Sequence, residues 1–156
     1  MLSRQLARIS IFLLISASLA SARDLALVSN KANSLETMTL PELVKICKGE
    51  SNRWPDGKAV TLIMRKPTSP EMRMVVEKIY GMSEKDVNDL IVAANHGRSS
   101  HPAILVVATD EDIVNQVAAL PGAIGIVDVY AINSSVSVVK LAGKLPLEPG
   151  YLLHGN

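Results

Sequence analysis

The chain has 156 residues, a formal net charge of +1 at neutral pH and one cysteine. The near balance of charge and the 3% content of aromatic residues exclude the basic, base-stacking surface of a nucleic-acid-binding protein. A single cysteine excludes an intrachain disulfide, and the length suits one domain with a modest core.

The first 22 residues have the three parts of a secretory signal. Arg4 and Arg8 are basic, residues 9–20 are apolar but too short for a usual membrane span, and the stretch ends in the small residues Ala-Ser-Ala. We therefore predict a signal peptide, cleavage after Ala22, and a periplasmic or secreted mature chain without stable membrane insertion. Because the signal carries two arginines and no acid, the mature chain has 14 basic and 15 acidic residues and a formal charge of −1.

The mature chain alternates between patterns typical of strands and of helices. Apolar, strand-like runs occur at 25–28, 59–64, 103–107, 123–129 and 136–141. Helical patterns begin at polar capping residues, which are Thr39, Ser69, Ser83 and Thr109. The first strand, helix and strand predict a right-handed parallel crossover.

This alternation predicts an α/β domain over 23–143, with a mostly parallel central sheet flanked by helices and an antiparallel strand at its edge. Residues 1–22 are then the signal peptide, and 144–156 form a tail along the surface in which His154 has no predicted role. Cys47 ends the apolar stripe of the first helix, which favours a buried, inert thiol over a reactive one.

Two segments are more distinctive than the rest. Residues 52–57 form a turn, Asn-Arg-Trp-Pro-Asp-Gly, that holds the only tryptophan. Residues 121–127 read Pro-Gly-Ala-Ile-Gly-Ile-Val, which is typical of a helix stop followed by a buried strand. Between them lie a strand that ends in Arg65 and a helix that begins at Ser69 and ends before Gly81.

In this order, these pieces resemble the phosphate-binding proteins of ABC transporters, a family with the type II periplasmic-binding-protein fold. The likeness runs from Leu25 to Gly143, and it is greatest to short, single-lobe members. It implies one lobe of that fold, a small oxyanion such as phosphate as ligand, and an ABC permease or another envelope protein as partner.

The resemblance also implies a site. In the family, an arginine at a strand end is followed four residues later by Ser-Gly-Thr at a helix N-terminus, where backbone N–H groups and the helix dipole attract an anion. Arg65 and Ser69 match this motif, while Pro70 and Glu71 replace its Gly and Thr. The tentative anion site is therefore Arg65, Ser69 and Glu71.

The replacements change the expected chemistry. Pro70 removes one N–H, and Glu71 places a negative charge where the anion would bind. Glu71 can also pair with Arg65 and fill the site from within. The alternative interpretation of this segment is a solvated strand-end arginine followed by an ordinary helix cap, and Trp54 can be a lid over the core.

Other chemistry is disfavoured. His96 and His101 are five residues apart and have no evident third ligand, which favours a solvated loop over a metal site. Nucleophile-elbow, Walker and dinucleotide motifs are missing, so we expect no enzyme activity and no cofactor. Two functions remain: a solute-binding domain for a small oxyanion, or a non-catalytic interaction module that keeps the lobe as a scaffold and has lost the ligand.

Overall fold

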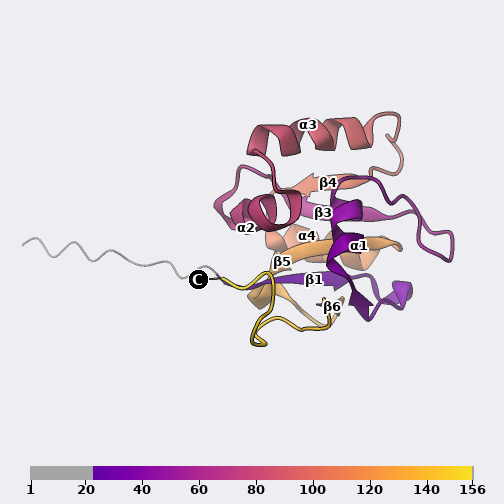
Figure 1. Cartoon of the computed structure of the whole chain (residues 1–156). Coiled ribbons are helices and arrows are strands. Elements are labelled where there is room, and N and C mark those ends of the chain that lie inside the picture. Colours follow the sequence, from indigo (N-terminus) through magenta and orange to yellow (C-terminus); the bar gives the residue numbers. More distant parts are fainter. Residues whose placement is uncertain (1–22, 156) are drawn as a thin grey trace, which may run out of the picture.

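Six strands form one sheet in the computed structural model, which describes residues 23–155 (Figure 1). Their order across the sheet is β2-β6-β1-β5-β3-β4. The pairs β3–β4, β3–β5 and β2–β6 are parallel, so the predicted α/β fold with a mostly parallel sheet is confirmed. The strands are β1 (Leu25–Ser29), β2 (Thr37–Met38), β3 (Thr61–Arg65), β4 (Ile104–Val107), β5 (Ala123–Asp128) and β6 (Ser137–Leu141).

Helices cover both faces of this sheet. The larger apolar cluster includes side chains of α1 (Leu40–Cys47), α2 (Arg73–Val75) and α3 (Glu84–Asn95), whereas α4 (Asp110–Ala119) packs in a smaller cluster. β1 contributes to both clusters in alternation, because Leu25 and Leu27 belong to the first and Ala26 and Val28 to the second. A strand covered on both faces buries every side chain, which explains its run of apolar residues.

Three of the predicted helix starts are confirmed. Thr39 forms a capping box, in which its hydroxyl accepts a hydrogen bond from the N–H of Glu42 and the Glu42 carboxylate accepts one from the N–H of Thr39. The hydroxyls of Ser83 and Thr109 each accept a hydrogen bond from the N–H three residues later. The fourth start, Ser69, differs and is described with the site.

The predicted parallel crossover from the first strand to the second is wrong. β1 is antiparallel to β5, while β3 is parallel to β5, so β1 and β3 run in opposite directions with β5 between them. The antiparallel strand is thus inside the sheet and not at its edge. The handedness rule applies only to strands that are already parallel, and long-range pairing with β5 and β6 sets the direction of β1.

The C-terminal segment packs into the fold and does not lie along the surface as predicted. Tyr151 and Leu153 are buried in the larger cluster. The N–H of Leu25 donates to the carbonyl of Leu153, and the Tyr151 hydroxyl donates to the carbonyl of Leu25. His154 also has a partner, because its Nδ1 lies 2.7 Å from Oδ1 of Asp24. Apolar side chains at alternate positions of the segment complete the core beside β1.

The predicted signal peptide, 1–22, lies outside the described residues, so cleavage after Ala22 stays a prediction. Within residues 23–155, no helix is long and apolar enough to cross a membrane.

Candidate functional site

Arg65 stands at the carboxyl end of β3, the only residue of that strand that is not buried. β3 lies between β4 and β5, and all three strands are parallel, so their carboxyl ends meet at one edge of the sheet. This edge is where open α/β sheets usually bind ligands. The Arg65 side chain is 24% exposed there.

Ser69 closes a turn and does not cap an α-helix. Its N–H and its hydroxyl both donate to the carbonyl of Lys66, at 2.9 and 2.7 Å, and its side chain forms no cap hydrogen bond. Pro70 follows and has no N–H to offer. The tentative site residue Ser69 is therefore near Arg65 in the chain, but its hydroxyl is already engaged in the local turn.

The helix predicted after Ser69 has a mixed form. It starts as a 3-10 turn (Pro70–Met72), continues as one α-helical turn (Arg73–Val75) and ends as a π-helical turn (Val76–Tyr80). An uncapped first turn commonly tightens to 3-10 geometry, which accounts for the difference from the predicted α-helix. The buried residues of the segment repeat at helical spacing and are Met72, Val75, Val76, Ile79 and Tyr80.

Two carboxylates contact the Arg65 guanidinium. Oε1 of Glu71 lies 3.6 Å from Nη1 of Arg65, and Oδ2 of Asp110 lies 3.5 Å from the same nitrogen. The pairing of Glu71 with Arg65, considered from the sequence, is confirmed. Nε of Arg65 is buried and has no hydrogen-bond partner among the described residues. The guanidinium is thus contacted by carboxylates without being fully satisfied by them.

Asp110 is the residue of this cluster that the sequence interpretation missed. The acidic residues 110–112 form the first turn of α4, where the helix dipole favours negative charge. Asp110 alone also belongs to the cluster, because it follows β4 and the carboxyl end of β4 is beside that of β3. The available signal is its position three residues after the strand-like run 103–107, in a sheet predicted to be mostly parallel.

Burial raises the pKa of Asp110 above its ordinary value, and the negative charge of Asp128 adds to this effect. The Arg65 guanidinium and the backbone of Asp128 act in the opposite direction but do not cancel it.

Asp128 ends β5 and forms an ion pair with Arg23 at 3.6 Å. Arg23 in turn stacks over the ring of Tyr130, with 4.8 Å from Cζ to the ring centroid. The edge therefore carries a mixed cluster of two arginines and three carboxylates.

The Trp54 turn contacts the loop at Pro121 and Gly122 and does not contact this cluster. The indole Nε1 of Trp54 donates to the carbonyl of Gly122 at 2.8 Å, and the ring packs on the larger apolar cluster. Gly122 has a φ of +87°, and a Cβ there would lie 2.1 Å from the carbonyl oxygen of Ala59. Both segments precede the amino ends of β3 and β5, at the opposite end of the strands from Arg65. Trp54 thus acts as a lid and cross-link.

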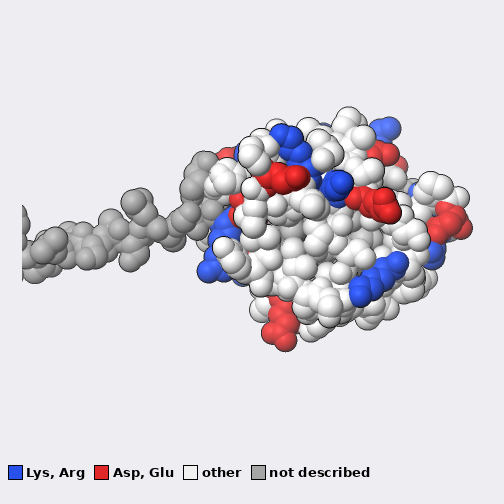
Figure 2. Space-filling view, turned by 90° about the horizontal axis from the view of Figure 1, so that it is seen from below, with Lys and Arg blue, Asp and Glu red and all other residues white. Residues whose placement is uncertain are grey.

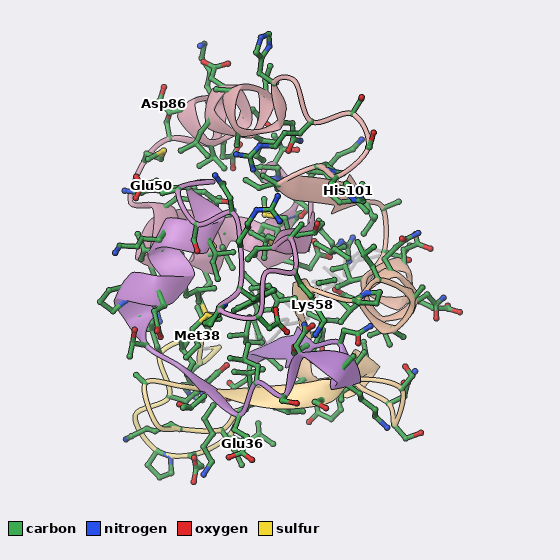
Figure 3. The ribbon with its side chains drawn as sticks, turned by 90° about the vertical axis from the view of Figure 1, so that its right-hand side faces the viewer. Glu36, Met38, Glu50, Lys58, Asp86 and His101 are labelled. Atoms are coloured by element: carbon green, nitrogen blue, oxygen red, sulfur yellow. The ribbon has the colours of Figure 1, made fainter. Side chains whose placement is uncertain are left out.

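Figure 1 agrees with this separation, because the loop between α1 and β3 projects at the right and β3 runs from it toward α2 at the left. Figure 3 looks at the right-hand end and shows Lys58, from that loop, near the centre, with His101 toward one flank.

Cys47 is buried, and this burial raises the pKa of its thiol to about 12. Within residues 23–155, no three His, Cys, Asp or Glu side chains are grouped so that they could hold a metal ion.

A groove of about 750 Å³ runs along the other edge of the sheet, between β6 and the segment that leads into β2. Its walls mix Lys31, Lys140 and Glu36 with hydroxyl groups and Leu35. Figure 2, which looks from below Figure 1, shows charged residues of both signs around a broad uncharged area. This groove offers no concentrated charge for an anion, so the Arg65 cluster remains the candidate site.

Comparison with known proteins identifies a fold and no sequence family. No family model and no curated protein matches the chain. An ABC-type phosphate transport receptor from Vibrio cholerae is 18% identical, with a TM-score of 0.68 over 86% of this chain and 55% of the receptor. PstS from Borrelia burgdorferi is 14% identical, with a TM-score of 0.65 over 87% of this chain and 56% of its own. A phosphate-binding protein from Stenotrophomonas maltophilia is 17% identical, with a TM-score of 0.59 over 81% and 41%.

The chain thus spans about half the length of the receptor structures that it matches. The predicted resemblance is confirmed for the fold. At sequence identities this low, the similarity of the structures shows a shared fold and nothing more. The chain has the α/β fold of ABC-type phosphate receptors, as a partial, single-lobe form of it.

Proposed function

We propose that this protein is an exported, non-catalytic solute-binding domain that binds phosphate or another small oxyanion for an ABC transport permease. The observation that carries the proposal is Arg65 at the carboxyl end of the inner strand β3, in a chain that shares the fold of phosphate receptors. Arginine is the side chain best suited to phosphate, because its planar guanidinium can donate two parallel hydrogen bonds.

The cluster around Arg65 limits the affinity. Glu71 and Asp110 already contact the guanidinium, and Ser69 and Pro70 supply fewer donors than a capped helix N-terminus would. A dissociation constant near 1 mM corresponds to only about −4 kcal/mol, which a single arginine in competition with a carboxylate can account for.

Calorimetric titration with phosphate and with sulfate tests the proposal on the wild type, Arg65→Ala and Glu71→Thr. We expect weak binding to the wild type, loss of binding in Arg65→Ala, and tighter binding in Glu71→Thr, because this change removes a competing negative charge. Arg73→Ala is the matched control, since Arg73 is an exposed arginine eight residues away on the same segment.

Two results would contradict the proposal. Equal binding to Arg65→Ala and to the wild type would exclude Arg65 as the counter-ion. If neither anion binds to any of these proteins, the proposed oxyanion binding is rejected. The better interpretation is then an interaction module that keeps the lobe as a scaffold.

A further inference from the structure

Arg65 is held by contacts that an anion can displace. Glu71 and Asp110 both approach Nη1, at 3.6 and 3.5 Å, which is longer than a strong charge-assisted hydrogen bond of about 2.8 Å. Neither contact is the paired, two-nitrogen arrangement that binds a carboxylate tightly to arginine. The Glu71 side chain is 43% exposed, so it can turn toward solvent and leave its place to a ligand.

Asp110 has no such freedom. It is the first residue of α4, and its side chain is only 21% exposed. The charged groups around it are Arg65 from β3, Glu71 from the 3-10 turn, and Asp128 from the end of β5 with its partner Arg23. The other acids at the start of its own helix, Glu111 and Asp112, are exposed.

The charges in this cluster add up to one negative charge, from two arginines and three carboxylates. An oxyanion beside Arg65 adds more negative charge to the same small volume. Glu71 can escape this repulsion by moving and Asp128 keeps Arg23, so Asp110 is left as the carboxylate that must be neutralised. A proton on its carboxyl group removes the repulsion and also turns an acceptor into a hydrogen-bond donor.

We propose that Asp110 is a further residue of the anion site and that an oxyanion binds to Arg65 together with a proton on Asp110. This inference rests on the proposed function and adds to it a residue and a coupling to pH. Glu71 then acts as the exchangeable internal ligand, and Asp110 acts as the group that balances charge when the anion enters.

Thermodynamic linkage sets the direction of the effect. If the pKa of Asp110 is higher in the complex than in the free protein, binding takes up a proton at pH values that lie between these two pKa values. Affinity then rises as the pH falls, by at most about tenfold per pH unit for one proton. Burial already raises the pKa of Asp110 in the free protein, so less acid is needed to reach this range.

The test is calorimetric titration with inorganic phosphate at about pH 4.5 and about pH 5.5, where phosphate is a monoanion throughout and Asp carboxyls titrate. We expect the wild type to bind about threefold to tenfold more tightly at the lower pH. Asp110→Asn should show a clearly smaller change and should bind at pH 5.5 at least as tightly as the wild type. Asp112→Asn, an exposed acid on the first turn of the same helix, should keep the wild-type pH dependence.

Proton uptake gives a second readout that needs no variant. Repeating the wild-type titration in buffers with different ionisation enthalpies should show net uptake of a fraction of one proton per phosphate bound. Absence of uptake, or an unchanged pH dependence in Asp110→Asn, would overturn the role of Asp110 while the Arg65 site stands. If phosphate binds to no variant at any pH, the proposed function and this inference both fail.

Discussion

At the scale of single residues, Cys47 is the simplest test of the core. Its side chain is fully buried, and burial raises the pKa of its thiol to about 12, an effect that the nearby Tyr80 hydroxyl opposes only partly. Because the thiolate is the reactive form, labelling of the native protein with a thiol reagent should be slow and should accelerate in denaturant. As the only cysteine, it gives an unambiguous signal. Rapid labelling without denaturant would show that the inner face of α1 opens in the native state.

At the scale of elements, one buried carboxylate helps to hold the C-terminal segment to the start of β1. Asp24 is 4% exposed, and its carboxylate accepts hydrogen bonds from the N–H groups of Leu147 and Gly155 and lies beside the ring of His154. Burial by itself raises the pKa of Asp24, but these contacts outweigh it and hold the pKa below its ordinary value. The charged form is therefore the one that stabilises the fold.

This arrangement predicts a pH-dependent stability. The contribution of Asp24 is present above its unfolded pKa of about 4 and is lost as the pH falls through its lower folded value. Asp24→Asn should lower the free energy of unfolding at neutral pH by about 2 kcal/mol. The Asn side chain keeps one oxygen as an acceptor, but it places its NH2 group, a donor, next to a backbone N–H that then has no acceptor. Urea unfolding at neutral and at acidic pH measures this, with Asp112→Asn as the exposed control. An equal loss at both pH values would refute the ionic role of Asp24.

At the scale of the whole molecule, export is the prediction with the simplest readout. Protein isolated from the native cell envelope should begin at Arg23, because residues 1–22 carry the basic, apolar and small-residue pattern of a signal peptide. Mass spectrometry of the intact protein decides this. Recovery of the full chain with Met1 from that fraction would instead indicate an uncleaved N-terminus.

Much of the fold follows from local sequence. The strand-like runs and the capping residue Thr39 are patterns of a few neighbouring residues, and the structure confirms them. The site was predictable only in part. Arg65 and Glu71 lie six residues apart and their contact was foreseen, whereas Asp110 is 45 residues from Arg65 and joins it through the β3–β4 pairing.

The sequence by itself determined where most strands and helices lie, that the domain is α/β, and that an arginine ends the strand before Ser69, because side-chain periodicity and capping act within one or two turns of the chain. Only the tertiary structure decided the direction of β1, the burial of Tyr151 and Leu153, and the meeting of Asp110 with Arg65. Each of these depends on which segments, far apart in the chain, form hydrogen bonds with each other. That choice is made by the packing of both faces of the sheet together, and no local pattern encodes it.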